Sequence, residues 1–193
     1  LADGIAFDVG DFHVKANYSG FYNVYNILAV YGAASLAKVP LENFNKILGD
    51  YTPQFGRNEL FQIADTKVML NLAKNPAGFN QNISAVMTDT SPKDVIILIN
   101  DNSQDGTDVS WLWDVDFDRL ADTNAASITV CGIRCQDMRL RLKYVDIPCD
   151  LEPDIEKAIS SKINNGVKNL YVLVNYTGLY TTHNILKRME GRK

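Results

Sequence analysis

Short apolar runs bounded by polar loops are the feature that most constrains how this chain can fold. Val95–Ile99, Ile128–Cys131 and Leu170–Val174 are almost entirely apolar, and segments of helical spacing lie between them. Runs of this length are typical of strands that are buried on both faces of a parallel sheet. At 193 residues, the chain therefore predicts one α/β domain, with a mainly parallel sheet covered by helices on both faces.

The spacing of apolar residues also predicts the remaining elements. A hairpin is expected from strands at 59–63 and 67–72, joined by a turn at 64–66. Helices are expected over 21–37, over 41–49, over 78–87, through Met138, Leu142 and Val145, over 153–164 and over 181–189. Residues 4–16 alternate as a strand does, with no helix or turn before them, so we expect a piece of a longer protein.

Charge and cysteine content exclude several classes of protein. The net charge is −4, and no dense cluster of Lys or Arg is present, so nucleic acid is not an expected partner. The longest apolar runs are far shorter than a bilayer-spanning helix, so no transmembrane segment is expected. Three cysteines are too few and odd in number for a disulfide framework, and no secretory signal precedes them. We therefore expect a cytoplasmic protein.

The loop over residues 100–114 is the richest in candidate chemistry, because it holds four carboxylates and both tryptophans. Asp101, Ser103, Asp105 and Gly106 match positions 1, 3, 5 and 6 of the calcium-binding loop of an EF-hand. The twelfth position of that pattern should be a bidentate glutamate, but it is Leu112, so no metal is predicted. Two readings stay open: a solvated loop whose carboxylates cap its own turns, or one carboxylate presented to a partner by a loop that the tryptophans anchor.

Nucleophilic catalysis within the chain has little support. Cys131 follows a strand, but the only histidines are the distant His13 and His183, so inert buried thiols are the simpler reading. Cys131 and Cys135 lack two further ligands at the spacing of a zinc site. No G-x-x-x-x-G-K-[ST] phosphate loop occurs.

Five polar side chains could contact a nucleotide or its neighbouring substrate. Asn23 and Asn26 lie one turn apart at a helix start, where amides could bond a purine edge, or Asn23 could simply cap the helix. Arg57 follows Gly56, and Lys74 precedes Asn75 and Pro76. Each cation could meet phosphate or ribose, or be a surface charge.

Several motifs resemble those of Mur ligases. FYNVYNILA from Phe21, GRNE from Gly56 and NLAKNP from Asn71 resemble their interdomain segment, their G-R-x-E turn and their substrate-facing loop. LNLAKNPAGFNQ from Leu70, LINDNSQDGTDVSWLWDVDF from Leu98 and VNYTGL from Val174 resemble more specifically the MurT family, the Mur ligase-like subunit of lipid II isoglutaminyl synthase. The D-G-x-D-x-S-W stretch at 105–111 is the specific part.

The resemblance implies a fold, a reaction and a partner. It implies a Rossmann-like Mur ligase C-terminal domain over residues 22–193, with residues 1–21 as the terminal strand of the preceding central domain. The implied enzyme is a carbon–nitrogen ligase of peptidoglycan synthesis that uses ATP and Mg²⁺. It amidates the α-carboxyl of D-glutamate in the lipid II stem peptide at the inner face of the membrane, with ammonia from a glutaminase subunit, GatD, in a heterodimer.

The resemblance also implies roles for individual residues. Asp108 would complete the partner's Cys–His site by holding the histidine in the tautomer that can deprotonate the cysteine. Asn23 and Asn26 would meet the adenine, and Arg57 the ribose or phosphates. Lys74 and Asn75 would face the substrate. The family's G-K-T phosphate loop and four-cysteine zinc ribbon are missing from this sequence.

Two alternatives stay open from the sequence. The chain could be a non-catalytic docking module in which the acidic loop over residues 100–114 only binds a partner. It could instead be a fragment of an amino-acid-adding Mur ligase, which takes a free amino acid and needs no glutaminase.

Overall fold

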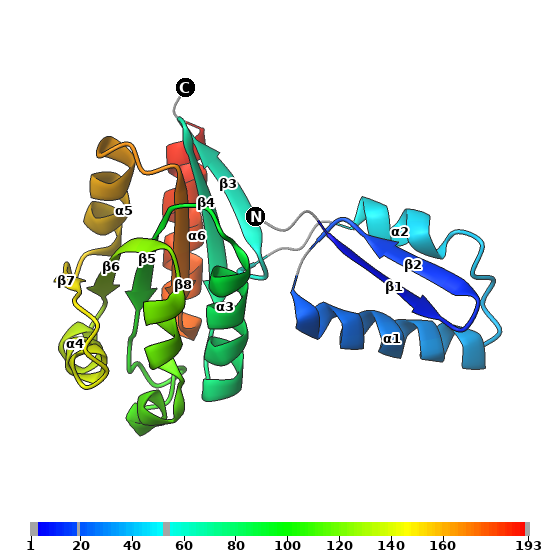
Figure 1. Ribbon diagram of the computed structural model, residues 1–193, viewed down its shortest axis with the longest axis horizontal. Coiled ribbons are helices and arrows are strands. Elements are labelled where there is room, and N and C mark those ends of the chain that lie inside the picture. Colours follow the sequence, from blue (N-terminus) through cyan, green and yellow to red (C-terminus); the bar gives the residue numbers. More distant parts are fainter. Residues whose placement is uncertain (1–3, 19, 52–54, 192–193) are drawn as a thin grey trace. The chain divides into compact units, whose positions relative to one another are not determined.

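The computed structural model describes residues 4–18, 20–51 and 55–191, which belong to two compact units, residues 1–53 and residues 54–193. Both are drawn in Figure 1. The division differs from the expected boundary after residue 21, because the helices at 21–36 and 44–50 share one apolar core with the strands before them. That residues 1–21 belong to a preceding domain stays a prediction.

The first unit is a hairpin covered by two helices. Strands β1 (Ile5–Val9) and β2 (Phe12–Ala16) pair antiparallel, followed by α1 (Phe21–Leu36) and α2 (Phe44–Asp50). The expectation of one strand over 4–16 was wrong, because the chain reverses after Gly10, whose φ of 59° suits a tight hairpin turn. The apolar positions change phase at the turn, from Ile5, Phe7 and Val9 to Phe12, Val14 and Ala16, so the sequence does carry a signal of the reversal in the two residues Gly10 and Asp11.

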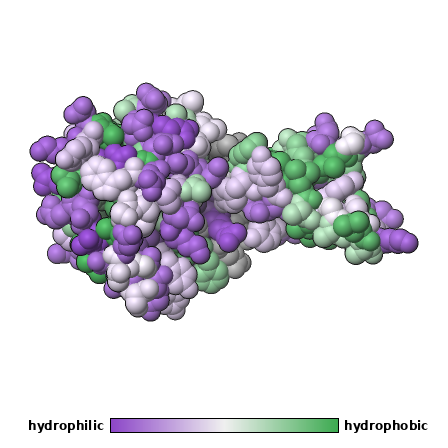
Figure 2. All heavy atoms as spheres, turned by 90° about the horizontal axis from the view of Figure 1, so that it is seen from below, coloured by the Kyte–Doolittle hydropathy of each residue, from purple (hydrophilic) through white to green (hydrophobic). Residues whose placement is uncertain are grey.

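One face of α1 remains apolar and exposed. Ile27 is its one buried residue. The exposed side chains of Phe21, Tyr25, Leu28 and Leu36 share this face, whereas the exposed Val30 lies on the opposite side of the helix. Figure 2 shows green, apolar atoms gathered over this unit, on the right of the view. An exposed apolar face of this kind marks a surface suited to contact with other protein.

The second unit holds a six-stranded sheet in the order β3-β4-β8-β5-β6-β7. Its strands are β3 (Glu59–Ile63), β4 (Thr66–Leu72), β5 (Lys93–Leu98), β6 (Ala125–Cys131), β7 (Asp150–Leu151) and β8 (Asn169–Val174). Only the β3–β4 pair is antiparallel, and the other pairs are parallel. The predicted mainly parallel sheet is therefore confirmed.

Helices cover both faces of this sheet (Figure 1). They are α3 (Pro76–Thr88), α4 (Cys135–Lys143), α5 (Ile155–Asn164) and α6 (Tyr176–Glu190), with the 3₁₀ helices η1 (Ser110–Asp114) and η2 (Phe117–Asp122). Ile96 and Leu98 of β5 pack in one core with residues of α5 and α6, and Ile97 is buried on the opposite face. Burial on both faces explains why the strand reads as a continuous apolar run.

In the part of the chain that the structure describes, no helix is long and apolar enough to cross a membrane.

Candidate functional site

The carboxyl edge of the parallel strands gathers the polar loops that the sequence singled out (Figure 1). Asn100 follows β5 and Asn175 follows β8. The Asn175 side chain donates from Nδ2 to the Asn100 carbonyl at 2.7 Å and accepts from the Asn100 amide at 3.1 Å. Two neighbouring strand ends are thus locked together where α/β folds usually bind ligands.

Asp105 fastens the acidic loop to the first turn of α6. Its carboxylate accepts from the backbone amide of Thr177 at 2.8 Å and from the Thr177 hydroxyl at 2.5 Å. The Asn102 side chain donates to the same hydroxyl at 2.9 Å. The Asp105 carboxylate therefore satisfies one of the amides that a helix start leaves unpaired, and the loop gains a fixed point between its two ends.

The end of β6 closes the other side of the loop. The Asn100 side chain accepts from the Ile133 amide at 3.1 Å. Gly132 has a φ of 86°, and a Cβ at this position would lie 2.5 Å from the Ile99 carbonyl oxygen. Only glycine therefore fits here without displacing the backbone. A crevice of about 390 Å³ opens at this edge, bordered by Gly132, Pro153 and Thr177 among others.

Asp108 stands exposed beyond this fixed part of the loop. Its Oδ1 accepts from the Ser110 backbone amide at 2.8 Å, the pattern of an Asx turn. That amide, and next the Ser110 side chain, lower the pKa of the Asp108 carboxyl below its ordinary value. Both readings of the loop thus have support: Asp105 and Asp108 cap backbone amides, and Asp108 also presents an ionised carboxylate at the surface.

Trp111 packs the segment after Asp108 against the rest of the unit, and Arg141, a residue that the sequence did not reveal, holds the same segment. Trp111 packs on Phe79 of α3, with ring centroids 5.7 Å apart. Arg141 of α4 lies over Trp113, 5.4 Å from the ring centroid. The buried Arg141 guanidinium also donates to the carbonyls of Leu112 and Val115 at 3.1 and 2.8 Å. The sequence did hold one signal of this role: Arg141 lies at helical spacing from the buried Met138 and beside the buried Leu142, so it falls on the buried face of α4.

The turn that carries Arg57 lies beside the end of β4, the strand that precedes Lys74 and Asn75. The amide of Leu72, the last residue of β4, donates to the Gly56 carbonyl at 2.7 Å, which sets the G-R-N-E turn beside that strand end. Arg57 and Lys74 are exposed. Asn75 accepts from the Gly78 amide at 2.8 Å and caps α3. A role of these residues in binding nucleotide or substrate stays a prediction.

Asn23 and Asn26 belong to the other compact unit. The side chain of Asn26 donates to that of Asn23 at 3.2 Å, so the expected shared face is present. The capping role considered for Asn23 was wrong, because α1 begins after Gly20, which occupies the N-cap position. Both amides lie within the first two turns of the helix.

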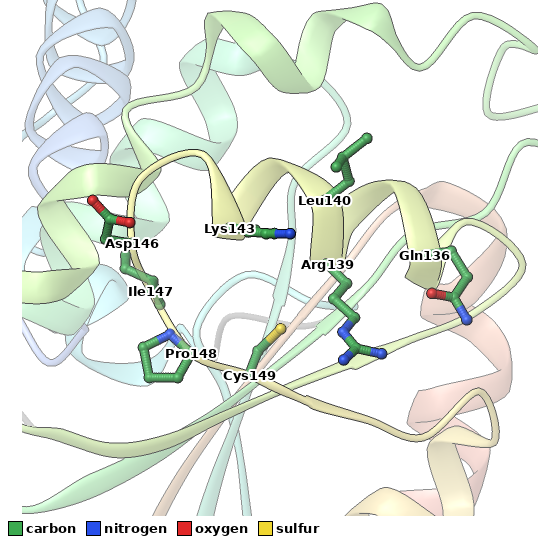
Figure 3. Close-up of a pocket in the computed structure, with 8 residues that line it drawn as sticks. All are labelled: Gln136, Arg139, Leu140, Lys143, Asp146, Ile147, Pro148 and Cys149. Carbon is green, nitrogen blue, oxygen red and sulfur yellow. The ribbon is translucent and has the colours of Figure 1, made fainter.

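Two of the cysteines, Cys131 and Cys149, are poor nucleophiles. Burial, reinforced by the negative charge of Glu152, raises the pKa of Cys131 to about 12. Burial also raises the pKa of Cys149, which the nearby Arg139 guanidinium opposes. Cys149 lines a second crevice of about 620 Å³ between α4 and the segment before β7, where Arg139 extends toward it (Figure 3). Thiols with raised pKa values form little thiolate at neutral pH.

Metal-ligating side chains do not cluster in the described ranges: no three of His, Cys, Asp or Glu there lie close enough together to hold an ion.

Two curated relatives carry the same name, lipid II isoglutaminyl synthase (glutamine-hydrolyzing) subunit MurT. The protein from Staphylococcus aureus (strain COL) is 33% identical over 182 residues, which cover 93% of this chain and 41% of the relative. The protein from Streptococcus pneumoniae (strain ATCC BAA-255 / R6) is 30% identical over 170 residues, which cover 86% of this chain and 38% of the relative. The chain thus spans about two fifths of the length of these relatives.

Solved structures of Mur ligases share the fold. MurF from Acinetobacter baumannii superposes with a TM-score of 0.69 at 16% identity, over 98% of this chain and 42% of that one. A pseudomurein peptide ligase type C from Methanothermus fervidus superposes with a TM-score of 0.69 at 15% identity, over 97% of this chain and 40% of that one. Residues 72–179, more than half of the chain, match the family model described as MurT ligase C-terminal, and the chain therefore belongs to that family.

Proposed function

We propose that this chain is the C-terminal domain of the ATP-dependent, Mur ligase-like subunit of lipid II isoglutaminyl synthase. The whole enzyme would amidate the α-carboxyl of D-glutamate in the lipid II stem peptide to D-isoglutamine. Ammonia would come from glutamine, hydrolysed by a separate glutaminase subunit, GatD, in the cytoplasm at the inner face of the membrane. The relatives named as MurT support this assignment.

The observation that carries the proposal is the exposed carboxylate of Asp108 on a loop fixed at both ends. The Asp105–Thr177 contacts hold one side of the loop, and Arg141 holds the other. The Asp108 carboxyl is ionised at neutral pH, as aspartates ordinarily are, and the Ser110 backbone amide lowers its pKa further. An ionised carboxylate that accepts the Nδ1 proton of a partner's histidine would orient the imidazole and stabilise its protonated form. The raised pKa values of Cys131 and Cys149 agree with a nucleophile on the partner.

ATP and Mg²⁺ fit the residues of this chain only in part. When bound, ATP with Mg²⁺ supplies the phosphoryl group that activates the carboxyl group of the acceptor. The exposed Arg57, on a turn held against the end of β4, would contact ribose or phosphate, and Asn23 and Asn26 would contact adenine. Lys74 would offset the negative charge that develops at the acceptor, with Asn75 beside it. The sequence has no phosphate loop and too few cysteines for the family's zinc ribbon, so we assign neither of these functions to this chain.

An Asp108→Asn substitution in the whole ligase-like subunit, purified with its glutaminase partner, tests the proposal. Asparagine keeps an oxygen for the Ser110 amide but removes the negative charge. We expect glutamine hydrolysis to fall by roughly 10²-fold or more, the usual contribution of groups that assist proton transfer, while the two subunits still copurify. Asp114→Asn, which alters an exposed carboxylate of the same segment, is the matched control and should leave hydrolysis unchanged.

The other possible results separate the alternatives. If Asp108→Asn weakens association, measured by calorimetry, and has no separate effect on turnover, the chain is a docking module. If a glutaminase subunit neither binds nor supplies ammonia and a free amino acid is ligated instead, the chain belongs to an amino-acid-adding ligase. Full glutaminase activity in an intact Asp108→Asn complex refutes the role of Asp108.

A further inference from the structure

The turn that carries Arg57 has an unusual backbone. Phe55, Gly56 and Asn58 have φ values of 51°, 70° and 53°, all in the left-handed region that non-glycine residues rarely adopt. At the non-glycine residues Phe55 and Asn58 this conformation costs about 1–3 kcal/mol each and persists only where the surrounding structure holds it. The exposed Arg57 is therefore presented by a turn that depends on its neighbours.

Four contacts hold this turn in place. The Gly56 amide donates to Glu59 Oε2 at 3.1 Å, and the Gly56 carbonyl accepts from the Leu72 amide at 2.7 Å. The Asn58 amide donates to the Asn71 side chain at 2.6 Å. A Cβ at position 56 would lie 2.4 Å from a methyl carbon of Leu179, so α6 packs closely over the turn.

His183 of α6 in turn fixes Glu59. Its Nδ1 lies 3.0 Å from Oε1 and 3.1 Å from Oε2 of Glu59, and only 8% of the imidazole and 13% of the Glu59 side chain are exposed. An ionised carboxylate only accepts hydrogen bonds, so Nδ1 carries the proton. Phe55 stacks on the ring at 5.4 Å and Phe61 meets it edge-on at 5.8 Å. The imidazole therefore has one orientation, and it holds the Glu59 carboxylate toward Gly56.

We propose that His183 is a positioning residue for Arg57, acting through Glu59 and the Gly56 amide. This inference rests on the proposed contact of Arg57 with ATP. Without the imidazole, the Glu59 carboxylate loses its charge-assisted partner in a nearly water-free place. A buried carboxylate without a hydrogen-bond donor is unfavourable, so the Glu59 side chain turns toward solvent and no longer accepts from the Gly56 amide. The turn then leaves its left-handed conformation, and the Arg57 side chain is no longer held in its binding position.

The test uses three variants of the whole subunit in its complex. His183→Phe keeps an aromatic ring between Phe55 and Phe61 but removes the donor. His183→Asn restores a donor near the position of Nδ1. His13→Phe is the matched control, because His13 also bonds a carboxylate, that of Asp8 at 2.6 Å, but both side chains are exposed and lie in the other unit.

We expect His183→Phe to raise KM for ATP roughly tenfold, in line with the cost of a misplaced binding group, with glutaminase turnover unchanged. Calorimetry should show the same loss of affinity for a non-hydrolysable ATP analogue. Hydrogen exchange of the peptide over residues 55–59 should become faster. His183→Asn should recover most of the affinity, and His13→Phe should behave as the unaltered protein.

A double substitution separates positioning from general stability. If His183 acts through Arg57, His183→Phe adds nothing to the KM of an Arg57→Ala variant. Additive effects, or unchanged exchange at 55–59 in His183→Phe, overturn the inference while the role of Arg57 stands. If Arg57→Ala leaves ATP affinity unchanged, the proposed nucleotide contact itself fails, whatever His183 does.

Discussion

Removing the Asp105 side chain should loosen the acidic loop from α6 and destabilise the second unit. Asp105→Ala deletes the acceptor of two hydrogen bonds from Thr177. Hydrogen bonds to charged groups are worth about 1.5–3 kcal/mol each, and loss of a side chain that caps a helix start costs about 1 kcal/mol. Because Asp105 is only half-buried, solvent screens the charge, and we take a total of about 2 kcal/mol.

Urea unfolding followed by tryptophan fluorescence measures this loss, since both tryptophans lie in the second unit. A loss of this size shifts the urea midpoint at constant slope and lowers Tm by roughly 4–8 °C. Asp105→Asn keeps one acceptor oxygen but turns an amide toward the other donor, so it should lose about 1 kcal/mol. Asp114→Asn, an exposed carboxylate, should not move the midpoint. If Asp105→Ala changes stability by less than about 0.5 kcal/mol, the usual effect of an ordinary surface substitution, the loop is not held by this contact.

Two further predictions concern the backbone and the anchor of the same site. Gly132→Ala should destabilise by about 2–4 kcal/mol, since it combines a left-handed φ with a Cβ only 2.5 Å from a carbonyl oxygen. Gly106→Ala, with a φ of 84° but open space around it, should cost only about 1 kcal/mol, and equal losses would contradict the steric argument. Arg141→Met should cost about 2–3 kcal/mol because two buried carbonyls lose their donor. Tryptophan emission should shift to the red in that variant, whereas the exposed Arg139→Met on the same helix should change neither stability nor emission.

Much of the fold follows from local pattern. The apolar runs at Val95–Ile99, Ile128–Cys131 and Leu170–Val174 became β5, β6 and β8, whose bounds differ from the expected ones by a few residues at most. Three elements were not predicted: β7 has only two residues, η1 lies in the segment that was expected as loop, and no element was predicted over the residues of η2. The hairpin at the N-terminus was missed although the apolar positions change phase at Gly10 and Asp11, which is the pattern of a two-residue hairpin turn.

The site was predictable in type but not in detail. The loop after β5 and its anchoring tryptophans follow from composition and from the strand before it. Which carboxylate faces inward does not follow, because the partner of Asp105 is Thr177, which lies 72 positions away in the sequence. The His183–Glu59 pair spans 124 positions. Such pairings are decided by how α6 packs on the sheet, and a single sequence carries no record of that packing.

One helix thus serves both ends of the proposed chemistry. Thr177 binds the loop whose carboxylate we propose faces the partner protein. Six residues later, about 9 Å further along the helix axis, His183 bonds Glu59 beside the turn whose guanidinium we propose contacts the nucleotide. A substitution that tilts or slides α6 displaces both groups at once. If the proposed function holds, a substitution that disrupts α6 should slow glutamine cleavage and ATP use together, although the two reactions would occur on different subunits.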